Sequence, residues 1–216
     1  RCGTSEGSSM HGYASDNFFR GPKVYFAFGA LAIAAASGLR ALVALPQLAG
    51  RIDVAALSAG VIYGGLIFLY EYWGWRCLST IKNLNGTWVG SITTTHNGGT
   101  TVPCVMRVRQ TWTRMAIELE TEQSRSRTTM TALYDDQPGD VGLKYEYVSE
   151  PRNLAVQTMH THRGVCTLAI TADSAETRLS GDYFTGRGRE TRGEINLHRV
   201  GRELLGFDAA LNKEKE

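Results

Sequence analysis

The sequence predicts a membrane protein in which a hairpin of two N-terminal transmembrane helices is followed by an all-β domain. Two runs without a charged residue, at 24–39 and 54–70, predict the helices, because crossing a bilayer takes about 20 mostly apolar helical residues. From residue 84 onward, apolar and polar side chains alternate with a period of two. That alternation is typical of strands with one buried face.

The N-terminal stretch shows neither pattern, so we expect residues 1–17 to be disordered. The chain begins with Arg1 and not with methionine, which makes Met10 a plausible start. The membrane segment then covers residues 18–78.

The first helix is expected at about 24–45, where Pro46 ends it. Arg40 lies near that end, and its long side chain can extend the guanidinium to the interface. The second helix is expected at about 54–75. Its last residues are aromatic and are followed by Arg76, which predicts an interfacial belt with a basic anchor.

The short connection between these helices predicts an antiparallel hairpin with both chain ends on one side. More basic residues lie near the helix ends on the side of the chain termini than at the hairpin tip. Those on the side of the termini are Arg20, Lys23, Arg76 and Lys82, and those at the tip are Arg40 and Arg51. The positive-inside rule therefore places the β-domain in the cytoplasm. A signal peptide would explain the first run but not the second, and two buried helices of a soluble protein would need a surrounding core.

Eight short strands are expected in the β-domain, residues 79–201, with Gly- and Pro-containing turns between several of them. They are Thr87–Thr95, Val105–Trp112, Met115–Thr121, Arg125–Tyr134, Leu143–Ser149, Val165–Thr171, Arg178–Thr185 and Gly193–Arg199. Such a series suits an antiparallel up-and-down β-barrel or a sandwich. The C-terminal tail, 202–216, is the only helix-like stretch that follows.

Alternation also assigns each side chain to a face of the barrel. The outer faces carry both signs of charge and are expected to be solvated. The inner set contains polar and aromatic residues: Gln110, Trp112, Ser126, Thr128, Tyr145, Tyr147, Tyr183 and, just ahead of a strand, His162. An eight-stranded barrel can hold one small ligand, and this set suits stacking and hydrogen bonding to nucleobases. A packed core with a few satisfied hydroxyls is the alternative.

Several kinds of chemistry find no support. The four cysteines form no close pair, which favours a reducing compartment, and we expect Cys104 and Cys166 simply to pack in strands. His160 and His162 lack a third ligand for a metal. No phosphate-binding glycine loop or nucleophile elbow is present. A net charge of +2 argues against a nucleic acid polymer as partner. We therefore expect no enzyme, no metal and no bound cofactor.

A series of short motifs follows the predicted hairpin in order. They are Leu84–Gly90 (LNGTWVG), Arg109–Trp112 (RQTW), Tyr145-x-Tyr147 before Glu150-Pro151, His162-x-Gly164, Leu179–Thr185 (LSGDYFT) and Arg192–Arg199 (RGEINLHR). Their order resembles the β-barrel membrane effectors of bacterial CBASS anti-phage systems, which have two transmembrane helices and a cyclic-nucleotide-sensing barrel. The resemblance covers about residues 20–200.

This resemblance implies a function that the residues alone do not. A cognate nucleotidyltransferase (a CD-NTase) makes a cyclic dinucleotide during phage infection, and the cytoplasmic barrel binds it. The effector then forms a homo-oligomer, disrupts the lipid bilayer of the inner membrane and kills the infected cell. Small residues such as Gly29, Ala32, Gly60 and Gly64 permit close helix packing, either within the hairpin or between copies.

Carried over to this sequence, the resemblance implies a ligand pocket with assigned roles. Its expected members are Gln110, Trp112, Ser126, Tyr145, Tyr147, His162, Tyr183, Arg187 and Arg189. Tyr145 and Tyr147 would stack on bases, and Gln110 and Ser126 would contact base edges. Arg187 or Arg189 would meet the phosphates, unless these arginines are solvated turn residues.

Gly86-x-Trp88 also resembles the first strand of lipocalins, so we assign Trp88 to the barrel floor, with Arg199 packed against it. Two alternatives to the effector stay open. A membrane-tethered, lipocalin-like carrier of an apolar ligand predicts an aliphatic interior. A structural membrane-anchored domain predicts an interior with no cavity.

Overall fold

The structure is a computed structural model that describes residues 9–15, 22–43, 59–95, 99–137, 140–152, 160–172, 176–186 and 191–215. The chain divides into two compact units. Residues 17–81 form one unit, and residues 1–16 together with 82–216 form the other. The N-terminal residues thus belong with the β-domain, although they are separated from it in sequence by the helices.

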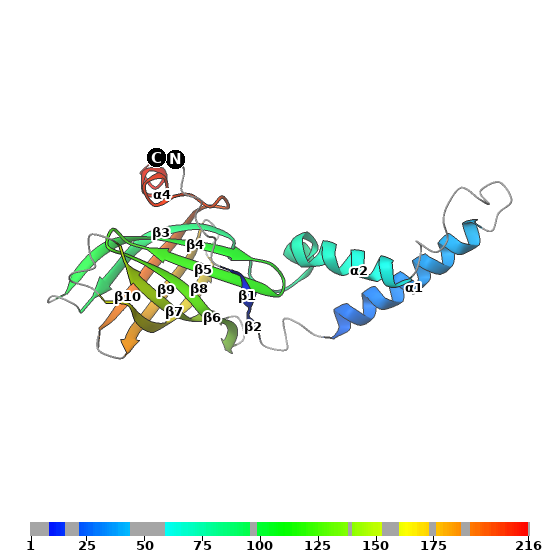
Figure 1. The fold of residues 1–216 in the computed structure, drawn as a ribbon, viewed down its shortest axis with the longest axis horizontal. Helices are drawn as coiled ribbons and strands as arrows, with labels where there is room; N and C mark the ends of the chain where they lie inside the picture. Colours follow the sequence, from blue (N-terminus) through cyan, green and yellow to red (C-terminus); the bar gives the residue numbers. More distant parts are fainter. Residues whose placement is uncertain are drawn as a thin grey trace. The chain divides into compact units, whose positions relative to one another are not determined.

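The β-domain is a closed antiparallel barrel of eight strands, as the alternation predicted (Figure 1). The strands are β3 (Gly86–Thr94), β4 (Thr100–Gln110), β5 (Arg114–Glu120), β6 (Ser124–Gln137), β7 (Asp140–Pro151), β8 (His162–Ala172), β9 (Thr177–Gly186) and β10 (Arg192–Gly201). Each pairs with its neighbours in sequence, and β10 pairs with β3 to close the sheet. The up-and-down barrel is therefore confirmed over the sandwich.

Two further short strands correct the prediction for the N-terminus. Strand β1 (His11–Gly12) pairs antiparallel with β5, and β2 (Ala14–Ser15) pairs parallel with β6. The expectation of disorder over 1–17 is thus wrong for the described residues 9–15. Strands of two residues are too short to show alternation, so only their tertiary pairing identifies them.

The floor of the barrel is built around Trp88, as predicted. Its side chain is fully buried, and its indole N–H donates to the Leu84 carbonyl at 3.0 Å. The Arg199 guanidinium lies 4.5 Å from the ring centroid, within the range of a cation–π contact. Nearby, Gly86 has a φ of +127°, and a Cβ there would overlap the Gly201 carbonyl oxygen. Glycine is therefore required where β3 begins.

The outer face of β5 is not the solvated surface that was expected. Glu118 is only 8% exposed and lies 2.9 Å from Arg125 and 3.5 Å from Arg107. Glu120 is also buried and forms ion pairs with Arg107 and Arg152. The correction has a physical reason: arginine side chains from the adjacent strands β4 and β6, and Arg152 after β7, lie against these carboxylates and neutralise their charge.

The C-terminal tail docks on the outside of the barrel. Helix α4 (Phe207–Lys213) buries Ala210 against Val89 and Val105. The preceding segment is held by hydrogen bonds, since Thr87 Oγ1 accepts from the backbone N–H of Leu205 at 2.9 Å. The tail is therefore part of the β-unit and shields one of its faces.

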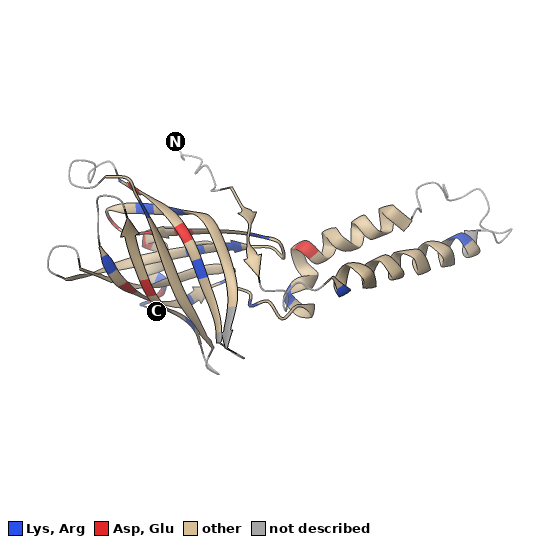
Figure 2. Cartoon of the chain, turned by 90° about the horizontal axis from the view of Figure 1, so that it is seen from below, with Lys and Arg blue, Asp and Glu red and all other residues tan. Residues whose placement is uncertain are grey.

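The helical unit contains α1 (Lys23–Val43) and α2 (Ala59–Leu69), which continues through a π-helical turn, η2 (Tyr70–Gly74), into α3 (Trp75–Leu78). Figure 2 shows how few charged residues these helices have. Among the described residues, one helix is long and apolar enough to cross a membrane, over Lys23–Ala41. The predicted connection and the start of the second predicted helix lie outside the described residues, so the transmembrane hairpin stays a proposal.

Helices α1 and α2 nevertheless pack against each other. Ala32 and Ala36 of α1 are buried, and the Phe28 ring meets Tyr70 of η2 edge-on at 5.2 Å. A Cβ added to Gly29 or to Gly64 would meet nothing within 4 Å. The alanines therefore contribute to this packing, whereas these two glycines do not touch a neighbouring helix.

Candidate functional site

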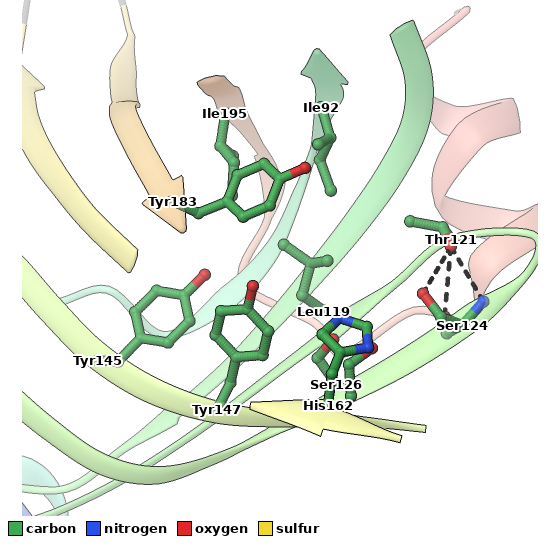
Figure 3. A pocket seen from close by; sticks show the side chains of 11 residues that line it. Ile92, Leu119, Thr121, Ser124, Ser126, Tyr145, Tyr147, His162, Tyr183 and Ile195 are labelled. Atoms are coloured by element: carbon green, nitrogen blue, oxygen red, sulfur yellow. Dashed lines mark hydrogen bonds between the residues drawn. The ribbon is translucent and has the colours of Figure 1, made fainter. Parts of the chain in front are cut away.

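The barrel contains an interior cavity of about 80 Å³. Its walls are formed by β3 and by the strands from β5 to β10, both included. The lining residues are Ile92, Leu119, Thr121, Ser124, Ser126, Tyr145, Tyr147, Ser149, His162, Tyr183 and Ile195. Figure 3 shows three tyrosine rings gathered around this space, with serine and threonine hydroxyls at one side. The site thus combines flat aromatic surfaces with many hydrogen-bonding groups.

Strand periodicity explains why the tyrosines meet. Tyr145 and Tyr147 are two residues apart on β7, so both face inward, and their ring centroids are 6.1 Å apart. Tyr183 enters from β9, and its strand neighbour is β8, which also pairs with β7. Three inward tyrosines from nearby strands therefore surround one space.

Glycines on adjacent strands make room for two of these rings. Gly164 is the β8 partner of Tyr147, and a Cβ there would overlap the tyrosine hydroxyl. Gly193 is the β10 partner of Tyr183, and a Cβ there would overlap both that ring and the Thr93 carbonyl oxygen. A side chain at either glycine would push its tyrosine out of place, so these glycines position the site.

Burial keeps the deep end of the cavity uncharged. It raises the pKa of Tyr145 well above its ordinary value, with Cys166 adding to the effect. Burial likewise raises the pKa of the Cys166 and Cys104 thiols to about 12. Both cysteines are buried and free, as predicted. At neutral pH the phenol is a neutral donor and acceptor, and the thiols are too basic to supply a nucleophile.

Hydroxyl groups dominate the side of the cavity nearest β5 and β6. Thr121 and Ser124 are hydrogen-bonded across the tight turn between these strands, with their hydroxyl oxygens 3.1 Å apart. His162 lies edge-on to Tyr147, with 6.5 Å between ring centroids, and its Nδ1 is 3.0 Å from the His160 carbonyl oxygen. These groups suit recognition of a ligand with both donors and acceptors.

The cavity opens into a wider mouth of about 430 Å³ that shares Ile92, Thr121, Ser124, His162 and Tyr183 with it. The other described residues of the mouth are Thr94, Thr100, Thr101, Val102, Pro103, Glu122, Gln123, Thr185 and Thr191. Pockets for drug-sized ligands measure about 300–1,000 Å³. The interior alone is below that range, whereas the interior and the mouth together are within it.

The structure brings five of the predicted pocket residues to this cavity: Ser126, Tyr145, Tyr147, His162 and Tyr183. Arg187 and Arg189 lie outside the described residues. Thr185 and Thr191, which lie on either side of them in the sequence, both line the mouth, and their hydroxyl oxygens are 2.8 Å apart.

Gln110 and Trp112 are not among the lining residues, which corrects their expected position. Strand β4 has Thr100 at the mouth and Gln110 at its opposite end. There, Gln110 Oε1 accepts from the Leu84 N–H at 2.8 Å, and its Nε2 donates to the Lys82 carbonyl at 3.2 Å. Alternation assigns a side chain to a face but not to a depth in the barrel, and Trp112 lies beyond the end of β4, in the connection to β5.

Other lining residues were not predicted. Thr121 follows the end of β5, Ser124 is the first residue of β6, and Ser149 is near the end of β7. Each lies two residues from an inward-facing neighbour (Leu119, Ser126 and Tyr147), so alternation carried to the strand ends would have found all three. Among the described residues, no three or more His, Cys, Asp or Glu side chains are grouped so that they could hold a metal ion.

Comparison with known proteins agrees with this architecture. Residues 79–199 match the family described as Cap15, cyclic dinucleotide receptor domain. The chain is also 30% identical over 151 residues to CD-NTase-associated protein 15 of Yersinia aleksiciae, covering 67% of this chain and 70% of that relative. The chain therefore belongs to the Cap15 family, the CBASS effectors with a cyclic dinucleotide receptor domain.

Proposed function

We propose that this effector binds a cyclic dinucleotide with one base inside the tyrosine-lined cavity and the rest of the ligand at the mouth. The observation that carries the proposal is the meeting of Tyr145, Tyr147 and Tyr183 around one space that opens to the outside. Stacking of a base on an aromatic side chain contributes about 1–3 kcal/mol. At about 80 Å³, the interior has no room for two bases and their phosphates.

The mouth offers hydroxyl groups where the phosphodiesters would lie. Its described lining includes six threonines and Ser124, with Glu122 as the one acidic residue. Neutral hydroxyls donate hydrogen bonds to phosphate oxygens without a cation. Arg187 and Arg189 stay part of the proposal, since they lie between two residues of the mouth in the sequence, and charge-assisted bonds from them would add to the affinity.

We also propose that ligand binding drives oligomerisation and disruption of the inner membrane, with the barrel in the cytoplasm. The support is the apolar helix α1, with Lys23 at its start and Arg40 in its last turn, and the uncharged helix α2 packed against it. Such helices suit a membrane interior, and a cytoplasmic barrel would meet a second messenger directly.

A ligand screen on the full-length chain in detergent tests the binding proposal. The panel is 3′,3′-cyclic di-AMP, di-GMP, GMP–AMP and di-UMP, alongside a cyclic trinucleotide, a fatty acid and haem. A true ligand at a hundred times its Kd stabilises the fold by about 2.7 kcal/mol, which shifts the melting temperature visibly. We expect one cyclic dinucleotide to do so.

Matched tyrosine variants locate the site. Tyr183→Leu removes a ring that lines the cavity, and we expect it to raise the Kd at least about tenfold, from the loss of roughly 1.4 kcal/mol or more. Tyr134→Leu is the control, because Tyr134 also packs over a cross-strand glycine, Gly142, but is not among the lining residues. Equal losses from both variants, or a response to the fatty acid or haem alone, would refute the proposal.

A further inference from the structure

Besides the β10–β3 pairing, closure of the barrel requires the ladder between β5 and β6, which is shorter than the other ladders of the barrel. Only Glu118, Leu119 and Glu120 of β5 pair with β6, through Arg127, Ser126 and Arg125 in turn. Beyond them the two strands separate. The backbone N–H of Ile117 there donates to the side chain of Thr128, at 3.0 Å, instead of to a backbone carbonyl.

The N-terminal residues 11–15, which we name the strap, fill the space between the separated strands. His11 and Gly12 pair with Met115 and Arg114 of β5. Ala14 and Ser15 pair with Ala132 and Leu133 of β6. The labels of β1 and β2 lie beside β5 and β6 in Figure 1. The strap thus covers strand edges that would otherwise have unpaired backbone groups.

One buried side chain anchors the strap. Tyr13 is 3% exposed, and its hydroxyl donates to the Trp112 carbonyl at 2.9 Å and accepts from Gln110 Nε2 at 3.3 Å. The same Gln110 side chain holds the backbone of Lys82 and Leu84. The helical unit, residues 17–81, follows the strap in the chain and ends just before Lys82. Gln110 therefore contacts one residue on each side of that unit in the sequence, Tyr13 and Lys82.

The proposed ligand cavity lies on the same short ladder. Leu119 and Ser126, which form its central pair, both line the cavity, and so do Thr121 and Ser124 in the turn that follows. A ligand that contacts these residues acts directly on the pairs that close the barrel. Two residue pairs on each strand hold the strap, together with the buried Tyr13 and the Tyr13 N–H, which donates to the Thr113 carbonyl at 3.3 Å. Each of these hydrogen bonds contributes about 1 kcal/mol net, so release of the strap requires that the ladder and the Tyr13 contacts change together.

We propose that the strap is the output element of the sensor: a ligand in the cavity rearranges the β5–β6 ladder and releases residues 11–15, which precede helix α1 in the chain. This inference rests on the proposed function. It assigns to Tyr13 and Gln110 a role in transmitting ligand binding toward the membrane helices, distinct from contact with the ligand.

A disulfide across the strap tests the proposal. Gly12 and Arg114 are paired on antiparallel strands, where Cα atoms lie about 4.5–5.5 Å apart, a spacing that a disulfide bridges. A Cβ at Gly12 meets nothing within 4 Å. The variant Gly12→Cys/Arg114→Cys is made in a full-length chain with Cys2 and Cys77 changed to Ser and is reconstituted in liposomes filled with a fluorescent dye.

We expect the oxidised variant to bind the cyclic dinucleotide selected in the screen with a raised Kd, because a ligand that releases the strap must bind the strapped form less tightly. At saturating ligand it should release at least about tenfold less dye than the wild type. Reduction should restore release, so the same chain serves as its own folding control. A control disulfide, Asp182→Cys/Glu194→Cys, joins exposed partners on the continuous β9–β10 ladder that line neither the cavity nor its mouth and should leave release unchanged. Full release by the oxidised strap variant at saturating ligand would overturn the proposal.

A second variant predicts the opposite change. Tyr13→Phe keeps the ring but removes the hydroxyl that contacts Trp112 and Gln110, and it should lower the ligand concentration for half-maximal release several-fold. An unchanged or higher concentration would contradict the strap's release. If the unmodified chain binds no cyclic dinucleotide, the proposed function fails and the strap mechanism fails with it. If it binds and leaks but neither variant alters the leakage, only the strap mechanism fails.

Discussion

The substitution Gly164→Ala probes how the barrel positions its aromatic cavity. The added Cβ would overlap Oη and Cζ of Tyr147 and would lie 2.7 Å from the Phe184 carbonyl oxygen. The ring must move toward the cavity, because the Phe184 carbonyl belongs to the backbone of a paired strand. Overpacking of this kind costs about 1–3 kcal/mol, or roughly 3–10 °C in melting temperature for a chain of this size.

The same change should weaken ligand binding. A Tyr147 ring displaced into a cavity of about 80 Å³ would occupy the position of a stacked base. Loss of one stacking contact of about 1–3 kcal/mol corresponds to a rise in Kd of roughly 5- to 150-fold. Melting in detergent and titration of the ligand selected in the screen measure the two effects on one sample.

Two controls make this prediction refutable. Gly186→Ala adds a Cβ that meets nothing within 4 Å and should change stability by less than about 0.5 kcal/mol. In a Tyr147→Leu background the ring is gone, so Gly164→Ala should cost at least about 1 kcal/mol less than in the wild type. If Gly164→Ala and Gly186→Ala behave alike, or if the cost does not depend on Tyr147, the glycine does not position the ring.

Two further predictions concern residues outside the cavity. Gln110→Ala leaves the Leu84 N–H and the Lys82 carbonyl without their partner, so we expect the free energy of unfolding in urea to fall by about 2–4 kcal/mol. The variant also loses the contact with Tyr13 that holds the strap, so the Kd should not rise. A raised Kd at equal stability would indicate that Gln110 contacts the ligand. Burial raises the pKa of Glu118, but the hydrogen bond and charge of Arg125, with Arg107, lower it more, to below the ordinary value of 4.5. The carboxylate therefore stabilises the fold fully above about pH 4.5, and this stabilisation is lost as the pH falls through the lower folded pKa. The stability difference between wild type and Glu118→Gln should shrink over that range, and a difference that is constant with pH would count against the ion-pair network.

Much of the barrel and part of the site could be predicted from local patterns. All eight barrel strands were expected near their observed positions, because a period of two is a property of each strand by itself. The same alternation predicted that Tyr145, Tyr147 and Tyr183 face inward, and in the structure all three line one cavity. The membrane hairpin and the roles of Arg187 and Arg189 stay predictions.

Tertiary structure decided the rest, for reasons that local sequence does not contain. Alternation gives the face of a side chain but not its depth in the barrel. Gln110 lies at the end of β4 away from the mouth, where it contacts Tyr13 and does not line the cavity. The burial of Glu118 depends on arginines from neighbouring strands. The strap consists of two-residue strands whose partners are about a hundred residues away, and only closure of the barrel creates the edges that they pair with.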